Sequence, residues 1–220
     1  MDIGLIKRRA KESIKRNYWP AVIGAMLITA SVATPTAVVK VNVNDISDLN
    51  VYIQQAASYA RPVFGTSIVA LLVKVFLLHP LEVGGRKFFF DNGRNTASLN
   101  EVSYAFGSRN YFNVVLTMFV RDIFNSLWFL LFVIPGFIKV YSYRLVPYIL
   151  FENPGIDPMT AITRSREMMN GHKMEAFLLD LSFIGWFILG VLSLGLGLFF
   201  WVSPYMSAAQ AEFYRSVRQA

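Results

Sequence analysis

The chain has 220 residues, of which 55% are hydrophobic and only 16% are charged, and its net charge is +7 at neutral pH. Ordinary soluble domains carry about 25% charged residues, and a soluble protein of this size needs a polar exterior. The composition therefore excludes a plain soluble enzyme and a disordered chain. The absence of cysteine excludes disulfides, thiol catalysis and thiolate metal sites. We predict an all-α, polytopic integral membrane protein.

Six segments are apolar enough to cross the hydrocarbon core of a membrane, which takes about 20 helical residues. They are residues 20–39, 62–83, 111–133, 136–151, 174–194 and 198–213, and residues 1–19 form a basic amphipathic helix before them. Proline followed by glycine ends a helix, so we interpret Ile134-Pro135-Gly136 as the turn of a hairpin, with a kinked or re-entrant segment as the alternative. We treat residues 1–220 as a single membrane domain.

Basic residues gather on one side of this topology. Six spans put both termini on the same side, and cytoplasmic loops retain Lys and Arg because moving these residues across a membrane is unfavourable. The long loop 40–61 on the other side has basic residues only at its two ends. We therefore expect a multi-pass protein of the cell membrane with both termini in the cytoplasm, and no nucleic-acid partner. The basic residues on the cytoplasmic side are Lys7, Arg8, Arg9, Lys11, Lys15, Arg16, Arg86, Lys87, Arg94, Arg109, Arg164, Arg166, Lys173, Arg215 and Arg218.

An amphipathic helix precedes each odd-numbered span, which suggests three units that each hold one such helix and two spans. The second of these helices begins at a capping box, Ser98-x-x-Glu101, and the third at Asp157 as N-cap. Two spans also begin alike, with Arg16-Asn17-Tyr18-Trp19 and Arg109-Asn110-Tyr111-Phe112. The apolar faces are formed by Ile3, Ile6, Ala10 and Ile14 in the first helix and by Leu99, Val102 and Phe106 in the second.

Five of the ionisable residues in the predicted spans lie at a similar depth, roughly 10–15 Å from the cytoplasmic ends if each residue rises ~1.5 Å. They are Lys74, Arg121, Asp122, Arg144 and Asp180. Adjacent helical residues point about 100° apart and need different partners, so we predict the pairs Asp122–Arg144 and Arg121–Asp180. Charges at this depth are functional hypotheses by default. The layer is either a polar pathway or anion site, or a set of interhelical pairs that fix packing.

The last predicted span carries a polar stripe at helical spacing: Ser203, Ser207, Gln210 and Tyr214. Pro204, beside it, is expected to bend the helix and free a carbonyl. The stripe must face protein or water, and it serves either hydrogen bonding between helices or a substrate route.

The basic first helix has two interpretations. It either binds anionic lipid, at about 1 kcal/mol for each basic residue near the membrane surface, or only sets the orientation of the chain. The lipid-binding candidates are Lys7, Arg8, Arg9, Lys11, Lys15 and Arg16. His79 and Glu82 have the spacing of half a metal site, but no second half follows. Because enzyme and nucleotide motifs are also absent from the sequence, we expect no catalytic residues, no cofactor and no metal.

Nearly the whole chain resembles a known family, most specifically its C-terminal half, and Arg9-Ala10-Lys11 and Asn17-Tyr18-Trp19 near the N-terminus also fit the pattern. Its motifs are similar to those of the bacterial integral membrane family catalogued as domain of unknown function 975, most closely from about residue 121 onward. Glu152 departs from the family's Asp before Asn-Pro but keeps a carboxylate. The resemblance implies a polytopic bacterial membrane protein with no established activity, and it supplies no catalytic residues. The matching motifs include Ile134-Pro135-Gly136, Pro147-Tyr148-Ile149-Leu150, Asn153-Pro154, Gly171-His172-Lys173, Ser182-Phe183-Ile184-Gly185-Trp186 and Pro204-Tyr205.

These observations favour a non-enzymatic accessory or scaffold protein that binds membrane lipids, through their anionic head groups, or a membrane-protein partner. The alternative is a transporter or lipid-handling protein that uses the charged layer.

Overall fold

The computed structural model describes residues 2–32, 68–94 and 96–219, and the regular structure in these ranges is entirely helical. This confirms the predicted all-α class. The elements are α1 (Ile3–Arg16), α2 (Tyr18–Val32), the π-helical η1 (Lys74–Leu78), α4 (His79–Asn92), the 3-10 helix η2 (Leu99–Ser103), α5 (Tyr104–Gly107), α6 (Tyr111–Leu131), α7 (Val133–Ser142), α8 (Val146–Glu152), α9 (Pro158–Met168), α10 (Lys173–Leu181), α11 (Ile184–Leu192), the π-helical η3 (Leu198–Val202) and α12 (Ser203–Gln219).

Three helical stretches in the described ranges are long and apolar enough to cross a membrane, fewer than the six predicted. They are Ile68–Asn92, which contains η1 and α4, Tyr111–Leu131, and Lys173–Leu192, which joins α10 and α11. They overlap the predicted spans 62–83, 111–133 and 174–194. The first predicted span is represented by a shorter apolar helix, Tyr18–Thr29. The predicted loop 40–61 lies outside the described residues.

The predicted span 136–151 is wrong as a single helix. α7 ends at Ser142 and α8 begins at Val146, with turn residues between them. Pro147 occupies the first turn of α8, where its missing N–H needs no helical partner. The break places Arg144 on a turn, which determines its partner.

The helical hairpin predicted near residue 135 is present, but its turn lies at Phe132. α6 ends at Leu131, and Phe132 is extended, with φ −155° and ψ 130°. Pro135 therefore lies within the first turn of α7, where proline is tolerated. A Cβ on Gly136 would lie 2.6 Å from the ring of Phe129, so glycine permits the close approach of α6 and α7. The alternative of a kink is excluded.

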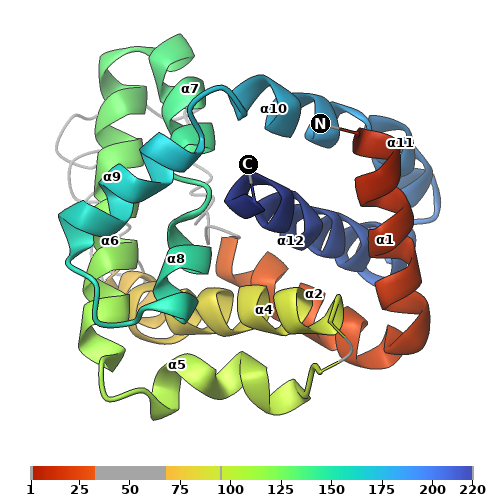
Figure 1. The fold of residues 1–220 in the computed structure, drawn as a ribbon, viewed down its shortest axis with the longest axis horizontal. Coiled ribbons are helices and arrows are strands. Elements are labelled where there is room, and N and C mark those ends of the chain that lie inside the picture. The colour runs from red at the N-terminus through yellow and green to blue at the C-terminus, as the bar shows by residue number, and fades with distance from the viewer. Residues whose placement is uncertain (1, 33–67, 95, 220) are drawn as a thin grey trace, which may run out of the picture.

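The amphipathic segments surround a core formed by α4, α8 and α12 (Figure 1). α1 packs on α12, η2 on α4 and α9 on α8, so each segment contacts the last helix of the preceding predicted unit, and α1 closes the ring. In the core, the rings of Tyr148 and Tyr214 stack with centroids 4.6 Å apart. As predicted, α1 buries Ile6, Ala10 and Ile14.

The second amphipathic segment departs from its prediction. It is a 3-10 helix followed by one α-helical turn, and only Val102 of its three expected apolar contacts is buried. The side chain of Ser98 caps the N–H of Asn100. The carboxylate of Glu101 binds Lys87 of α4 instead of completing a capping box with Ser98. In contrast, Asp157 caps α9 as predicted.

The two similar span beginnings make the same contact. The hydroxyl of Tyr18 donates to the carbonyl of Phe200 at 2.9 Å, and that of Tyr111 donates to the carbonyl of Phe76 at 2.5 Å. Each acceptor lies four residues before a proline, whose ring nitrogen cannot donate to it. Each of these two carbonyls instead accepts a hydrogen bond from a tyrosine of another predicted unit. The carbonyl of Phe200 fits the prediction that Pro204 frees a carbonyl in the last span.

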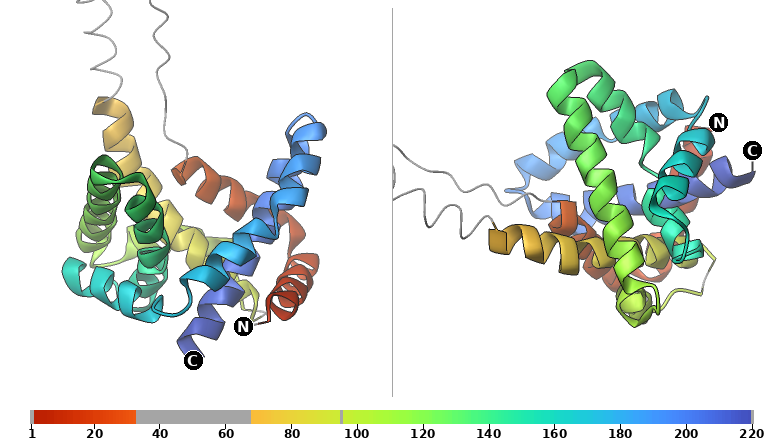
Figure 2. Two further views of the ribbon diagram at one scale, coloured as in Figure 1. Left: turned by 90° about the horizontal axis from the view of Figure 1, so that it is seen from above. Right: turned by 90° about the vertical axis from the view of Figure 1, so that its left-hand side faces the viewer.

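Large apolar side chains are exposed at one end of the molecule. This apolar end comprises residues 68–77, 127–140 and 184–201, and in Figure 2 (left) these segments point to the same side. The opposite, packed end holds α1, η2, α5, α8, α9 and the parts of α4 and α12 that contact them, and it contains most of the buried core. The fold thus joins a compact helical base to projecting apolar helices.

Candidate functional site

The five ionisable residues predicted to share one layer divide into two separate clusters. In the first, a carboxylate oxygen of Asp122 lies 2.9 Å from the ammonium group of Lys74 and 3.1 Å from Nε2 of His79. The guanidinium of Arg121 also contacts Asp122 at 2.9 Å. The predicted pair Asp122–Arg144 is wrong, because the partners of Asp122 on other helices lie on η1 and α4, both of which contact α6.

The second cluster is a closed ion pair. Arg144 donates two hydrogen bonds to the two carboxylate oxygens of Asp180, each at 2.8 Å. Tyr141 donates a third at 3.1 Å. The predicted pair Arg121–Asp180 is therefore also wrong. This bidentate geometry joins α10 to the α7–α8 turn, and we call it the Arg144–Asp180 pair.

Glu82, like His79 and Arg86, was left out of the predicted charged layer, although it is central to the first cluster. Its buried carboxylate accepts hydrogen bonds from both terminal nitrogens of Arg121, at 3.2 Å each, and lies 4.0 Å from Arg86. Arg86 in turn donates to the side-chain oxygen of Gln210. A continuous chain of polar contacts thus runs from Asp122 on α6 across α4 to Gln210 on α12.

We call Lys74, His79, Glu82, Arg86, Arg121 and Asp122 the ionic network. The signal for its α4 members was present in the sequence, because positions 79, 82 and 86 have the i, i+3, i+7 spacing of one helical face. It was overlooked because Glu82 and Arg86 were placed at or beyond the end of a span, whereas the helix continues to Asn92.

A cavity lies at each end of the ionic network. One, of about 450 Å³, is lined by Lys74, His79 and Asp122 together with apolar residues of α6 and the start of helix Ile68–Asn92. The other, of about 480 Å³, is lined by Arg86, Gln210 and residues of α2, α11, η3 and α12. We call them the Lys74 cavity and the Arg86 cavity.

The predicted polar stripe is divided between cavity and core. Ser203, Ser207 and Gln210 line the Arg86 cavity, and Ser203 also forms a 2.7 Å hydrogen bond with Thr29 of α2. Tyr214 instead lies in the aromatic core, stacked on Tyr148. Three of the four residues therefore face an open space, and the fourth serves packing.

The basic residues of α1 do not share one environment. Lys7 donates to the backbone and side-chain oxygens of Ser182, at 3.0 and 3.2 Å, and lies 4.5 Å from the ring centroid of Phe183. Partial burial lowers the pKa of Lys7. Arg8 is exposed, whereas Arg9 and Arg16 line a polar hollow shared with α12.

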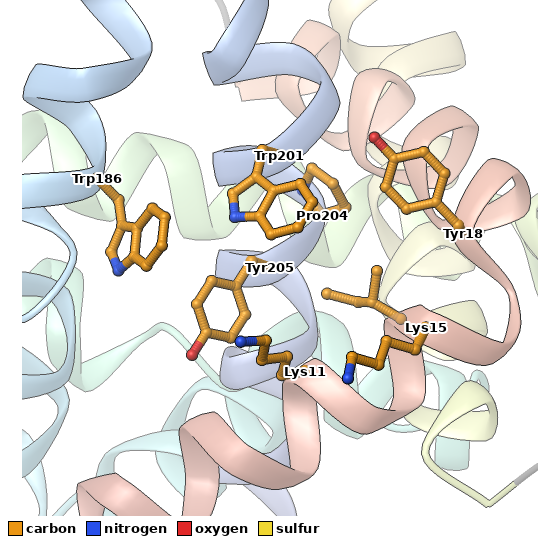
Figure 3. A pocket seen from close by; sticks show the side chains of 8 residues that line it. Lys11, Lys15, Tyr18, Trp186, Trp201, Pro204 and Tyr205 are labelled. Carbon is orange, nitrogen blue, oxygen red and sulfur yellow. The ribbon is translucent and has the colours of Figure 1, made fainter.

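Lys11 and Lys15 line a different hollow, which has aromatic walls (Figure 3). They project from α1 on the side where Tyr205 and Trp201 lie. The cavity measures about 280 Å³, and we call it the aromatic pocket. Within the described residues, neither lysine has an acidic side chain within 4.0 Å. Its lining is Lys11, Ile14, Lys15, Tyr18, Trp186, Trp201, Pro204 and Tyr205.

The walls of the aromatic pocket are held by contacts with one another and with neighbouring residues. The hydroxyl of Tyr18 is bound to the carbonyl of Phe200, which ties α2 to η3. Tyr205 packs edge-to-face on Trp186 and on Phe183, with centroids 6.1 and 5.0 Å apart. The pocket therefore offers two unpaired ammonium groups beside a rigid aromatic surface, which suits an anionic head group with an apolar tail. In the described ranges no group of three His, Asp or Glu side chains could hold a metal ion.

A family model described as "Protein of unknown function (DUF975)" matches residues 129–220. No curated protein and no solved structure matches the chain. The matched segment contains the Arg144–Asp180 pair, the polar stripe and the aromatic wall formed by Trp186, Trp201 and Tyr205, but not α1 or the ionic network before residue 129. The resemblance noted in the sequence is thereby confirmed over residues 129–220, which carry the pattern of the DUF975 family of unknown function.

Proposed function

We propose that this protein is a non-enzymatic, multi-pass protein of the bacterial cell membrane that binds anionic lipid in the aromatic pocket and serves as an accessory or scaffold protein. The observation that carries the proposal is the position of Lys11 and Lys15, which have no acidic partner within the described residues, beside the aromatic wall. The three long apolar helices support a membrane location.

The chemistry of the pocket matches a membrane interface. Trp and Tyr side chains favour the level of the lipid head groups, where one end of the ring is apolar and the other is hydrated. Lysines near that surface attract anionic lipid. A lipid phosphate would lie between Lys11 and Lys15, and its acyl chain would run along Trp201 and Trp186 towards the apolar end.

The same arrangement supports an orientation of the protein in the membrane. The basic amphipathic segments belong to the packed end, and the exposed apolar residues belong to the opposite end. We place the packed end at the cytoplasmic surface, with both termini in the cytoplasm, and the apolar end in the hydrocarbon. The exposed apolar helices then contact lipid chains or a partner membrane protein.

The test compares two pairs of substitutions on α1. Lys11→Gln with Lys15→Gln (K11Q/K15Q) removes the pocket cations, and Arg8→Gln with Arg9→Gln (R8Q/R9Q) removes the same charge elsewhere on the helix. Each protein is extracted from its membrane in polymer nanodiscs, transferred to mixed phosphatidylglycerol and phosphatidylcholine, and its retained lipid is measured by native mass spectrometry. We expect a loss of retained phosphatidylglycerol of threefold or more in K11Q/K15Q and little change in R8Q/R9Q. Equal retention in both variants would contradict the proposal.

A second candidate function is the handling of an amphiphile or ion along the charged layer. It is favoured by the ionic network, which has a cavity at each end. It is weakened by the separate Arg144–Asp180 pair, because the five predicted residues do not line one path. Flux assays on Arg121→Gln in liposomes test it: transport that is lost while the protein stays folded would favour this candidate.

A further inference from the structure

The ionic network carries one positive charge more than its carboxylates balance when His79 is neutral. Within the described residues its permanent cations are Lys74, Arg86 and Arg121, and its anions are Glu82 and Asp122. Asp122 lies 2.9 Å from both Lys74 and Arg121. The excess charge therefore resides with the remaining cation, Arg86.

The contacts of Arg86 show why it carries the excess. The nearest carboxylate among the described residues, on Glu82, is 4.0 Å away and already accepts two hydrogen bonds from Arg121. Its direct hydrogen bond is to the neutral amide of Gln210, and its Nε has no partner in the described residues. The Arg86 side chain is only 13% exposed. A cation held this way inside an apolar bundle is unfavourable unless an anion balances it.

The Arg86 cavity supplies both a polar and an apolar surface around this cation. Hydroxyls of Thr29, Ser203 and Ser207 lie along one part of its lining. Phe187, Leu198 and Phe199, which belong to or adjoin the apolar end, form another part. The volume of about 480 Å³ is within the usual range of small-molecule sites.

We infer that the Arg86 cavity binds a single-chain amphiphile with a monoanionic head group, of which a long-chain carboxylate is the simplest example. The carboxylate pairs with the Arg86 guanidinium and accepts hydrogen bonds from the hydroxyls, and the acyl chain follows Phe187, Leu198 and Phe199. One negative charge neutralises the network, so charge complementarity selects this class of ligand. The site is separate from the aromatic pocket and does not depend on the function proposed for it.

The cysteine-free chain allows a direct test with one introduced thiol. Thr29→Cys places the thiol at an exposed position in the lining of the cavity, and Ser207→Cys provides a second position. The protein is placed in phosphatidylcholine nanodiscs, and the rate of modification by a small methanethiosulfonate reagent is measured with oleate, with oleyl alcohol, with phosphatidylglycerol and without additive. We expect oleate to slow modification at least fivefold at both positions and oleyl alcohol to have less than a twofold effect.

The role of Arg86 is tested in the same assay. Arg86→Gln in the Thr29→Cys background should abolish protection by oleate, whereas Arg86→Lys, which keeps the charge, should retain much of it. Arg8→Gln removes one exposed cation elsewhere and should leave protection unchanged. If Arg86→Gln does not yield a monodisperse protein, the comparison between oleate and oleyl alcohol still tests whether the cavity selects an anionic head group, because it needs no change at Arg86.

Three outcomes would overturn the inference. Equal protection by oleate and oleyl alcohol would show an apolar groove without an anion site, and no protection by oleate at either cysteine would show that the cavity does not take this amphiphile. Protection by a two-chain phosphatidylglycerol in place of oleate would assign the site to bulk phospholipid and would also contradict the proposed ligand class.

Discussion

The two ionic clusters use buried charge in different ways. The Arg144–Asp180 pair has equal and opposite charges, bidentate geometry and a tyrosine donor, so its members satisfy one another. The ionic network links three helices, opens to a cavity at each end and carries an excess cation at Arg86. Charges at similar depth in predicted spans can thus have separate roles. The Arg144–Asp180 pair fixes packing, whereas the ionic network can still bind an anion at Arg86.

The largest loss of folding stability is expected for a substitution at Arg121, in the centre of the ionic network. Arg121→Gln would leave the distant Arg86 as the remaining cation near the buried carboxylate of Glu82. It would also remove one of the cations that contact Asp122. Removing one partner of a buried pair costs about 3–5 kcal/mol. Unfolding of the purified protein by denaturant in detergent micelles measures this loss. Arg86→Gln removes the excess charge and should cost less than about 1 kcal/mol. If both variants lose stability equally, the claim of an excess cation at Arg86 is wrong.

A closed pair should show strong coupling between its members. Arg144→Gln or Asp180→Asn alone should lower stability by about 2–3 kcal/mol, because each leaves one charge without a partner. The double substitution should lose much less than the sum of the two single losses, which is the signature of direct interaction. The same denaturant assay completes the cycle. Additive losses would show that this pair does not fix the contact between α10 and the α7–α8 turn.

The smallest loss of folding stability is expected for Tyr18 and Tyr111, which make the same contact in two predicted units. Tyr18→Phe and Tyr111→Phe each remove one hydrogen bond to a carbonyl that precedes a proline by four residues, and each should cost about 1 kcal/mol. Tyr104→Phe is the control, because it removes the same hydroxyl group from a tyrosine that takes no part in this contact. Thermal unfolding of the three variants is the measurement. A pronounced difference between Tyr18→Phe and Tyr111→Phe would argue against equivalent units.

Helices with strong local signals were predictable from the sequence. The apolar length of Tyr111–Leu131 and Lys173–Leu192 was recognised to within about two residues, and Asp157 with Pro158 marked the start of α9. The Ile-Pro-Gly motif indicated a hairpin, although the turn itself is at Phe132, because proline is accommodated in the first turn of the following helix.

Tertiary neighbours were not predictable in the same way. The predicted charge pairs assumed that Arg121 and Asp122 of α6 find their partners on the following hairpin helix and on α10, whereas these partners lie on η1 and α4 of the preceding unit. Helical periodicity gives the face on which Glu82 lies, but not the helix that covers this face. The aromatic pocket combines α1 with residues about 170 to 190 positions later, and no local pattern indicates such a contact.

The most direct test of the proposed function is to locate bound lipid on the wild-type protein. A photoactivatable phosphatidylglycerol in nanodiscs is cross-linked, and the modified peptides are identified by mass spectrometry. We predict that the modifications concentrate on peptides containing Trp186, Trp201 and Tyr205 and are lost in K11Q/K15Q but not in R8Q/R9Q. An even distribution over the apolar end, unchanged in K11Q/K15Q, would contradict a specific lipid site in the aromatic pocket.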